Sequence, residues 1–394
     1  MSTREVVMLG GARTAIGDYG GALKDVAPTK LGSIAIKEAL ARAKIDPASV
    51  GHVVMGSVIH GEARDMYLSR VAAIDAGLPV GTPCLTVNRL CGSGLQAIVS
   101  AAQHILLGDT DTVVGGGAES MSRAAYFLPA GRWGQRMGDE PVIDAMTGAL
   151  HDPFGHGHMG VTAENIAAKY GFTREQQDQF ALESHRRAAN ALERGYFRSQ
   201  IVPIELKTRK GVEQYATDEH VRPGARIEDL AKLRAVFKKD GTVTAGNASG
   251  LNDAGAAMVM CSSEYSRQNN LKPVARLVGY AHAGVEPQVM GLGPIPASKR
   301  VFEKTGLKPS DMDVVESNEA FAAQAMAVTK DLGLDPAKVN PNGGAVALGH
   351  PIGATGAILA VKALYELQRT QKRYALVTMC IGGGQGIAAI FERA

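Results

Sequence analysis

Residues 374–386, YALVTMCIGGGQG, combine an apolar strand-like run, a thiol and three consecutive glycines in one short stretch. Residues 111–121, DTVVGGGAESM, repeat the order of a short apolar run followed by three glycines. An amphipathic helical pattern precedes each stretch, at residues 95–107 and 355–367. The repetition indicates a duplicated α/β half, and the seam between two such halves is a natural place for an active site.

The pattern outside these stretches also indicates α/β layers. Short apolar runs typical of strands lie at residues 5–9, 50–58 and 313–315. They alternate with helical patterns at residues 31–43 and 95–107, and the second of these has Gly108 as its expected C-cap. A helix is also expected from Asn318 onward. This alternation is typical of an α/β protein.

A polar module interrupts the first half. From about Met121 to Gly246 the content of glycine, proline, histidine and charge rises, and Thr173–Gln176 forms a capping box before a long polar helix. The sequence therefore predicts three parts. They are an N-terminal half of residues 1–120 and 250–272, an inserted module of residues 121–249, and a C-terminal half of residues 273–394.

The composition of the 394 residues is that of an ordinary globular protein, with 45% hydrophobic and 21% charged residues. A net charge of +3 gives no overall field for holding nucleic acid or an anionic membrane. We expect no signal peptide and no apolar run of the roughly 18 residues needed to cross a bilayer. The four cysteines form no CxxC pair, which argues against structural zinc, and a reducing cytoplasm is the expected location.

Cys91 is a candidate nucleophile. It precedes Gly92, Ser93 and Gly94 at the start of a predicted helix. Unpaired N–H groups and the positive end of the helix dipole favour thiolate there, and glycines allow a carbonyl to approach backbone donors. A small buried cysteine before a tightly packed helix is the alternative.

His350 is a candidate base, since it lies between Gly349 and Pro351 in what should be a rigid turn at a helix start. Such a turn would hold one tautomer and one direction of the ring. A base near a thiol would complete a nucleophile–base pair. A hydrogen-bonded structural histidine explains the segment equally well.

Two further positions have both a chemical and a structural explanation. Cys380 ends a strand beside glycines, where a second thiol could serve as a general acid and base, although simple packing also explains it. Asn318 and Glu319 lie where a strand gives way to a helix. An amide there could hold a water or orient a base, whereas an N-cap role is the structural alternative.

Metal and dinucleotide sites are not expected. His151, His156 and His158 lie close in sequence, but the region is rich in glycine and lacks a clear fourth ligand or helical spacing. The glycine run GGGQG at residues 382–386 lacks the G-x-G-x-x-G order of a dinucleotide fingerprint.

Several segments together resemble the thiolase family, in the family's order, and the resemblance spans nearly the whole chain. They are VNRLCGSGLQA (87–97), SNEAF (317–321), NPNGGAVALGHPIGATG (340–356) and CIGGGQGIAAIFER (380–393), with RTAIGDYGGALKD (13–25) and GTVTAGNASGLNDAGAA (241–257). The biosynthetic type is the most similar. The resemblance implies two βαβαβαββ halves in five αβαβα layers, a loop domain over the active site, and a homotetramer.

The resemblance also implies a role for each matching residue. Cys91 would accept the acyl group, His350 would activate it and polarise the second thioester oxygen, and Cys380 would remove the α-proton. Asn318 would hold a water of one oxyanion hole, and the backbone N–H groups of Cys91 and Gly382 would form the other. No cofactor is expected, because coenzyme A is a substrate and product. Its nucleotide and pantetheine contacts would be Arg222, Phe237 and Ser249, and the acyl tunnel would be lined by Leu150, His158, Met159, Ala320 and Phe321.

A Claisen condensation of two thioesters needs one attacking thiolate, a separate base and two sites for negative oxygen, and two cysteines beside glycines suit it. We expect Cys91, near a helix N-terminus, to have the lower pKa of the two. The expected reaction is the reversible condensation of acetyl-CoA with an acyl-CoA. The alternatives are a longer-chain degradative thiolase, a decarboxylating ketosynthase, which would lack Cys380, and a non-catalytic acyl-CoA carrier, which would have lost Cys91 or His350. The acidic Asp229 is unexpected beside a phosphorylated ligand.

Overall fold

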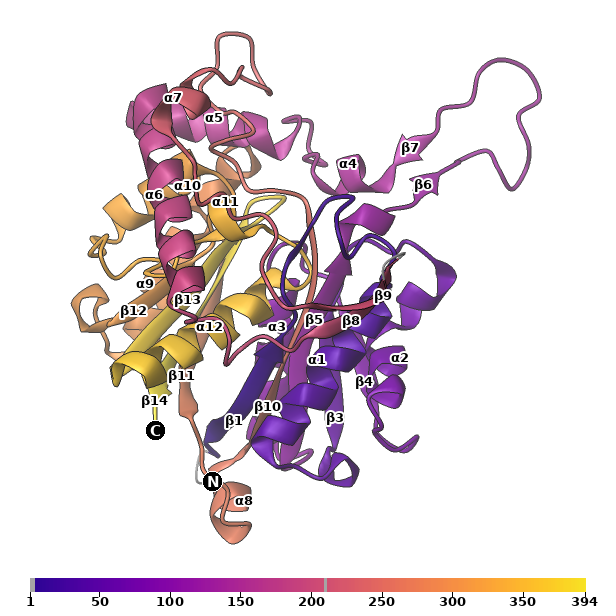
Figure 1. Cartoon of the computed structure of the whole chain (residues 1–394), viewed down its shortest axis with the longest axis vertical. Coiled ribbons are helices and arrows are strands. Elements are labelled where there is room, and N and C mark those ends of the chain that lie inside the picture. The colour runs from indigo at the N-terminus through magenta and orange to yellow at the C-terminus, as the bar shows by residue number, and fades with distance from the viewer. Residues whose placement is uncertain (1–3, 209–210) are drawn as a thin grey trace.

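The structure, a computed structural model, describes residues 4–208 and 211–394 (Figure 1). Within these residues nine strands follow one path of hydrogen-bonded neighbours, in the order β12-β13-β14-β11-β1-β10-β5-β3-β4. A short tenth strand, β2 (Gly17–Asp18), pairs with β10. The path divides into two similar mixed sheets that meet between β1 and β11.

The sheet of the N-terminal half has parallel pairs at its outer edge and antiparallel pairs at its inner edge. β3 pairs in parallel with β4 and β5, whereas β10 lies antiparallel between β5 and β1. Its strands are β1 (Val6–Arg13), β3 (His52–Gly56), β4 (Cys84–Val87), β5 (Thr112–Ser120) and β10 (Asn252–Ser262).

The sheet of the C-terminal half repeats this pattern. β12 pairs in parallel with β13, and β14 lies antiparallel between β13 and β11. Val339 adds an isolated parallel bridge to Val315 at the place where β4 stands in the first half. The strands are β11 (Ala275–Gly284), β12 (Val314–Ser317), β13 (Tyr374–Ile381) and β14 (Gln385–Arg393). Among the described residues, the two sheets pair with each other at two positions, Val7 with Arg276 and Met8 with Ala275.

Three layers of helices enclose the two sheets, which confirms the predicted five-layer αβαβα thiolase fold. Side chains of α3 and α12 fill a central core with residues from both sheets. α1 and α2 cover the outer face of the first sheet, and α9 and α10 cover the outer face of the second. These helices are α1 (Pro28–Ala43), α2 (Leu68–Asp75), α3 (Ser93–Leu107), α9 (Pro294–Thr305), α10 (Ala322–Asp331) and α12 (Thr355–Thr370).

β14 shows why the sheets are apolar on both faces. Ile387, Ala389 and Phe391 belong to the central core, whereas Ala388 and Ile390 belong to the outer one. Successive strand residues point to opposite faces, so a strand between two helical layers must be apolar at every position.

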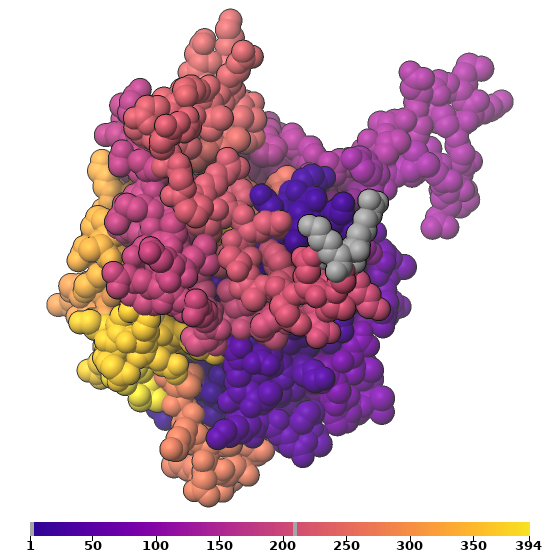
Figure 2. Space-filling view, in the orientation of Figure 1, coloured from indigo at the N-terminus to yellow at the C-terminus, as the bar shows by residue number. Residues whose placement is uncertain are grey.

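The inserted module lies over one end of the sheets, and a long hairpin extends from it (Figures 1 and 2). Its helices and strands are β6 (Tyr126–Phe127), β7 (Ile143–Asp144), α4 (Ala145–Ala149), α5 (Met159–Tyr170), α6 (Arg174–Glu193), β8 (Ile204–Thr208), β9 (Gly211–Tyr215) and α7 (Ile227–Ala231). The predicted capping box is present, since Thr173 Oγ1 accepts the Gln176 N–H at 3.2 Å. A buried bidentate pair between Arg13 of β1 and Asp218, at 2.7 and 2.9 Å, ties the module to the first sheet.

Shorter elements complete the described chain. α8 (Ser263–Gln268) follows β10, and α11 (Ala345–Leu348) precedes the loop of His350. Single 3₁₀ turns are η1 (Pro47–Ser49), η2 (Ala63–Tyr67), η3 (Met121–Arg123), η4 (Pro287–Leu292) and η5 (Pro309–Asp311). The boundaries predicted for the three parts of the chain stay a prediction.

Three expectations from the sequence need correction. β5 continues through its three glycines to Ser120 instead of ending before them. α10 begins at Ala322, so Asn318 lies in a loop before the helix rather than within it. The window Leu90–Leu107 does reach the length and hydropathy of a membrane-spanning helix, but α3 occupies it and packs in the central core.

Candidate active site

The four predicted reacting side chains come together at the seam between the two halves. One comes from the first half and three from the second: Cys91, Asn318, His350 and Cys380. Asn318 Nδ2 lies 3.4 Å from His350 Nε2. The pKa of Cys380 is raised by burial and then by the charge of a Cys91 thiolate, so the two sulfur atoms lie within electrostatic reach of each other. The sequence places these residues up to 289 positions apart, and the fold collects them.

Cys91 lies in a tight turn that side chains support. Leu90 has a φ of 43°, in the left-handed region, and its N–H donates to Asn88 Oδ1 at 2.9 Å. Ser93 Oγ accepts the Arg89 N–H at 2.8 Å and donates to the Leu90 carbonyl at 2.6 Å. An uncommon backbone conformation is thus maintained by three local hydrogen bonds, which points to a functional constraint on this turn.

The pKa of the Cys91 thiol is raised by burial, and the charge of Glu119 adds to this. The backbone N–H groups of Gly382 and of Cys91 itself hydrogen-bond the thiol and lower its pKa, but they do not compensate. The expectation that the helix dipole would favour thiolate is therefore wrong for the free protein. α3 begins two residues later, at Ser93, and burial has the largest effect on the pKa of this thiol.

His350 is buried in one orientation. Its backbone N–H donates to Asn252 Oδ1 at 2.9 Å, and its Nδ1 lies 2.7 Å from Thr355 Oγ1. The Thr355 hydroxyl donates to the Pro351 carbonyl at 2.9 Å, so it must accept the Nδ1–H. Nε2 is then unprotonated, so it accepts from the Asn318 Nδ2–H 3.4 Å away and has a lone pair that a proton can occupy. Burial lowers the pKa of His350 to about 4, so the ring is neutral at pH 7.

Asn318 brings an unsatisfied acceptor into the site. Its N–H donates to the Thr378 carbonyl at 3.0 Å, which fixes the loop after β12 to β13. Its Oδ1 is buried and has no hydrogen-bond partner in the part of the chain that the structure describes. A buried polar atom without a partner is costly unless a water or ligand satisfies it, so this amide suits the binding of a water.

Cys380 is fully buried near the end of β13, opposite Gly386 of β14. Burial raises the pKa of its thiol well above the ordinary range, and the Cys91 thiolate raises it further. It packs with Met159, Met290 and Phe321 in a small apolar cluster. Cys380 is therefore a neutral thiol in the free protein, with a proton available for transfer.

The glycines after β13 form a turn that exposes backbone donors. Gly383 and Gly384 have φ angles of 79° and 87°, which side-chain-bearing residues rarely adopt. A Cβ on Gly382 would come within 2.9 Å of the Leu90 side chain, next to Cys91. The turn thus brings the Gly382 N–H against the sulfur of Cys91, where a substrate carbonyl could also reach it.

Most of the predicted substrate-contacting residues line one apolar patch around Cys380. Met159, Ala320 and Phe321 belong to its cluster and Phe237 packs against it. The rings of His158 and Phe237 stack at 4.7 Å, and Phe237 meets Phe321 edge to face at 6.1 Å. The backbone connects the remaining two, since the Leu150 carbonyl accepts the Met159 N–H and the Ser249 N–H donates to the Ala320 carbonyl.

Arg222 lies in a different place. It lines a cavity of about 740 Å³ with His185, Arg186 and Asn190 of α6. The Arg222 N–H donates to His185 Nδ1 at 3.2 Å. The unexpected Asp229 is neutralised locally, because Arg226 and Lys232 both contact its carboxylate. Asp229 does not line the cavity. The charged lining residues of the cavity are Arg186, Arg222 and one acid, Glu193, so the lining keeps a net positive charge that suits an anion.

The three clustered histidines do not form a metal site. His158 Nδ1 accepts the Gly160 N–H at 3.0 Å, and His151 meets the His158 ring edge to face at 5.3 Å. Among residues 4–208 and 211–394, no group of three or more His, Cys, Asp or Glu side chains is arranged to hold a metal ion.

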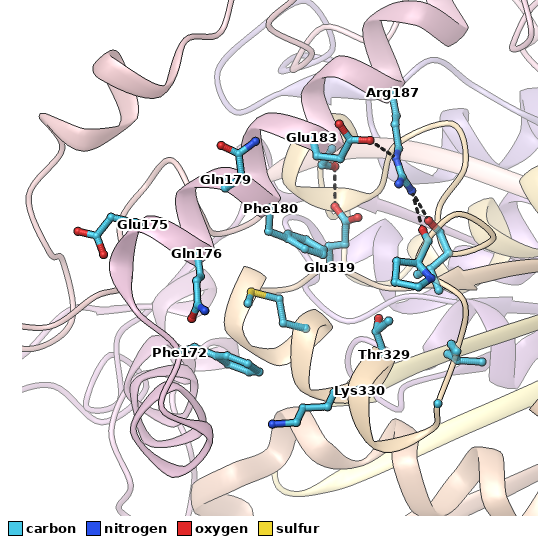
Figure 3. A pocket seen from close by; sticks show the side chains of 16 residues that line it. Phe172, Glu175, Gln176, Gln179, Phe180, Glu183, Arg187, Glu319, Thr329 and Lys330 are labelled. Carbon is cyan, nitrogen blue, oxygen red and sulfur yellow. Dashed lines mark hydrogen bonds and ion pairs between the residues drawn. The ribbon is translucent and has the colours of Figure 1, made fainter.

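A cavity of about 1040 Å³ lies between α6 and α10, and neither thiol lines it (Figure 3). Glu319 reaches it from the loop that carries Asn318. The Glu319 carboxylate accepts hydrogen bonds from Ser184 at 2.7 Å, Asn340 at 2.8 Å and the Val346 N–H at 3.2 Å. These hydrogen bonds support the loop that carries Asn318. The cavity is therefore separate from the site where the thiols react.

Sequence reasoning missed four residues that hold the reacting groups: Ser93, Glu119, Asn252 and Thr355. Thr355 and Ser93 lie within the glycine-rich stretches, so a hydroxyl two to five residues after each reactive side chain was a local signal. Asn252 and Glu119 act across more than 90 positions, and nothing local identifies them.

Comparison with known proteins agrees with this geometry. The family models for the N-terminal and C-terminal domains of thiolase match residues 6–264 and 271–393. The chain is 66% identical to the beta-ketothiolase BktB of Cupriavidus necator, over 99% of this chain and 100% of that protein. It is 48% identical to the acetyl-CoA acetyltransferase of Allochromatium vinosum, over 98% and 99%. Human mitochondrial 3-ketoacyl-CoA thiolase in complex with CoA superposes with a TM-score of 0.96, at 44% identity and over 100% and 98% of the two chains.

Proposed function

Because the chain belongs to the thiolase family, we propose that it catalyses the reversible condensation of acetyl-CoA with an acyl-CoA. The main reaction is the formation of acetoacetyl-CoA from two acetyl-CoA molecules, and thiolysis is its reverse. One observation carries this proposal. A half-buried thiol and a fully buried thiol interact beside a neutral histidine and two backbone N–H donors.

The first half of the reaction loads an acyl group onto Cys91. Its sulfur attacks the thioester carbonyl while its proton passes to the free Nε2 of His350. The N–H groups of Cys91 and Gly382 bind the oxygen of the tetrahedral adduct, where its negative charge develops. When the adduct collapses, the bond to the CoA sulfur breaks and Cys380 gives its proton to that sulfur. The products are an acyl-enzyme, a His350 imidazolium and a Cys380 thiolate.

The second half forms the carbon–carbon bond. The Cys380 thiolate removes the α-proton of acetyl-CoA, and the imidazolium Nε2–H and a water held by Asn318 bind the enolate oxygen. The carbanion attacks the acyl carbonyl and the Cys91 sulfur leaves, taking back the proton of His350. Cys380 has regained its proton, so the balance closes with β-ketoacyl-CoA and one free CoA.

Electrostatics support this order of events. Burial holds Cys380 in its thiol form in the free protein. Its proton leaves only when the adduct collapses; the acyl group then leaves no negative charge on Cys91, and the His350 imidazolium makes a Cys380 thiolate less costly. The base therefore becomes competent only after the acyl-enzyme has formed.

The substrate contacts follow the same reasoning. Leu150, His158, Met159, Phe237, Ser249, Ala320 and Phe321 hold pantetheine and the acyl group, and Arg222 and its cavity hold the nucleotide. Coenzyme A is substrate and product, and we propose that the reaction needs no metal or organic cofactor. We further propose a cytoplasmic homotetramer. The extended hairpin supports it, since Tyr126, Phe127, Trp133 and Met137 are more than half exposed there.

Two of the alternatives conflict with the site. A decarboxylating ketosynthase has no use for the buried Cys380, and a non-catalytic carrier has no use for an oriented His350. A longer-chain degradative thiolase uses the same residues, but the 66% identity to a beta-ketothiolase does not favour it. Rates with β-ketoacyl-CoA substrates of increasing chain length would separate the proposed acetoacetyl-CoA enzyme from a longer-chain thiolase.

The first experiment is CoA-dependent loss of acetoacetyl-CoA with the purified protein, beside Cys380→Ser. We expect thiolysis to fall by about 10²–10⁴-fold in the variant, while acetyl-CoA still acetylates Cys91 in an intact-mass measurement. Cys84→Ser, at a half-buried position on β4, is the control and should keep full activity. Full thiolysis in Cys380→Ser would refute the assignment of the base. Acetylated Cys91 with no thiolysis in the wild type would mean another acyl length.

A further inference from the structure

Glu119 is a fully buried carboxylate at the end of β5 that has no part in the mechanism above. Its partners in the described chain are backbone N–H groups. Oε2 accepts from Val58 at 3.0 Å and from Gly353 at 2.9 Å, and Oε1 accepts from Ile59 at 3.2 Å. Burial raises its pKa to about 8 although these three donors oppose the shift. A buried charge without a cation is costly for the fold, so its presence calls for a functional reason.

The three donors come from both halves of the molecule. Val58 and Ile59 follow β3 in the first half, whereas Gly353 follows His350 by three residues in the second. The carboxylate therefore spans the seam and fastens the loop of His350 to the half that carries Cys91.

Glycines allow the loop to approach this closely. A Cβ on Gly117 would come within 2.2 Å of the Gly353 carbonyl oxygen, and a Cβ on Gly56 within 2.8 Å. A Cβ on Gly94 of α3 would come within 3.1 Å of the same atom. Three elements of the first half thus lack a side chain where the loop of the second half enters. Packing alone limits where the loop of His350 can lie. The hydrogen bond from the Gly353 N–H to Glu119 also fixes the orientation of the loop.

Glu119 also acts on the nucleophile through space. Its negative charge raises the pKa of the Cys91 thiol. Among charged groups, Asp65 of η2 acts on Glu119 itself and raises its pKa. Glu119 is thus connected to the loop of the base by its hydrogen bond from the Gly353 N–H, and to the nucleophile by its charge.

We propose that Glu119 is a positioning residue of this thiolase, which sets the direction of His350 Nε2 toward the sulfur of Cys91. It touches neither substrate nor reacting atoms and acts through the Gly353 N–H. The proposal rests on the proposed function of Cys91 and His350, but one of its two tests does not depend on turnover.

The test compares Glu119→Gln with Glu119→Asp. The amide keeps the length of the side chain but removes the charge and turns an NH₂ group toward backbone donors. Aspartate keeps the charge but is one carbon too short to reach Gly353. Glu392→Gln is the control, since this carboxylate lies at the far end of β14 and pairs with Arg276 and Arg373. Two quantities are measured: kcat and KM for acetoacetyl-CoA thiolysis, and the pH midpoint of iodoacetamide labelling of the Cys91 peptide.

Both Glu119 variants should lose about 10–10²-fold in kcat with KM within about threefold, because a small misplacement of a catalytic pair costs rate and not binding. The labelling midpoint should move to lower pH in Glu119→Gln and stay in place in Glu119→Asp. Glu392→Gln should match the wild type in both quantities. Labelling needs no turnover, so a wild type without thiolysis would contradict the proposed function while the midpoint shift still tests Glu119.

Wild-type kcat in both variants, or an unmoved labelling midpoint in Glu119→Gln, would overturn the proposal. Variants that do not fold, as judged by circular dichroism and thermal melting, would also overturn it. Glu119 would then serve the fold and not the alignment of the site.

Discussion

The two runs of three consecutive glycines, one within β5 and one after β13, serve different physical purposes. In β5, Gly115, Gly116 and Gly117 continue the extended strand, and none of them has a φ in the left-handed region. A Cβ on Gly115 would lie 2.7 Å from the Ile98 backbone, and a Cβ on Gly117 would lie 2.2 Å from the Gly353 carbonyl. These glycines allow close packing.

β13 ends at Ile381, before its glycines begin. Gly383 and Gly384 then adopt positive φ angles and turn the chain, so that the Gly382 N–H meets Cys91. These glycines provide a backbone conformation. The same three residues allow the two halves to pack closely at β5 and present a backbone donor after β13. Only the surrounding residues distinguish the two uses.

The buried carboxylates of the two halves offer the strongest test of this contrast. Burial raises the pKa of Glu119 to about 8, whereas that of Glu316 on β12 rises only to about 6 because Lys362 opposes the shift. A raised pKa means that the folded state binds protons more tightly than the unfolded state. The stabilising contribution of each carboxyl group is full below about pH 4.5 and is lost as the pH rises through the pKa of that group in the folded state.

Ionisation of Glu119 should therefore lower the free energy of unfolding by about 5 kcal/mol between pH 4.5 and 8. Ionisation of Glu316 should lower it by about 2 kcal/mol, and this loss is complete near pH 6. Urea midpoints of the wild type should fall between pH 6 and 8, and Glu119→Gln should flatten that part of the curve. Equal slopes in both proteins would contradict the charge assigned to Glu119.

Two buried ion pairs should respond differently to loss of the acid: Arg13–Asp218, between the N-terminal half and the inserted module, and Glu316–Lys362, within the C-terminal half. Asp218→Asn leaves Arg13 charged in the interior, because a guanidinium does not release its proton. We expect a loss of about 3–5 kcal/mol in the free energy of unfolding. Glu316→Gln should cost less, because Lys362 keeps its bond to the Gly343 carbonyl and an amide oxygen at position 316 can still accept from it. Thermal melting at pH 7 compares them, and a larger loss in Glu316→Gln would reverse the argument.

Alanine substitution at one glycine of each run tests whether that glycine is needed for close packing or for its backbone conformation. Gly117→Ala introduces a clash with the Gly353 backbone and should cost about 1–3 kcal/mol and reduce activity, because the loop of His350 must move. Gly383→Ala has only the Phe154 ring near it, at 3.9 Å, but forces a left-handed residue, at about 1–2 kcal/mol. Denaturation and kcat are measured on both. If Gly117→Ala retains full kcat, close approach at the seam is not what aligns His350.

A hydroxyl at the start of each central helix holds one reactive residue, and removing it should have the smallest effect. Thr355→Val takes away the acceptor of His350 Nδ1–H, and kcat should fall about tenfold because the ring loses its tautomer and direction. Ser93→Ala weakens the Cys91 turn and should cost a few-fold, since Asn88 still supports Leu90. Steady-state kinetics test the order, and Thr378→Val, which also loses a buried threonine hydroxyl in the C-terminal half, is a matched control. A larger loss in Ser93→Ala would show that the turn matters more than the tautomer.

Local patterns predicted local structure well. The capping box of α6 and the Gly108 cap of α3 are present as expected, because each depends on residues within one turn of the helix end. The length of β5 was underestimated, since glycine weakens any pattern of apolar alternation. The start of α10 was placed too early, because the loop of Asn318 is held by Thr378 and the Glu319 contacts and not by a local cap.

The sequence by itself determined which groups are available: two thiols beside glycines, a histidine in a turn and an amide after a strand. It also determined the α/β layers, since periodicity and caps are local. Only the tertiary structure decided how those groups behave. Burial raises the pKa of Cys91 where the helix dipole alone would lower it, and Thr355 decides which nitrogen of His350 carries the proton. Glu119 and Asn252 reach the His350 loop from the other half. Desolvation and long-range hydrogen bonds depend on what surrounds a group after folding, and no local pattern in the chain records them.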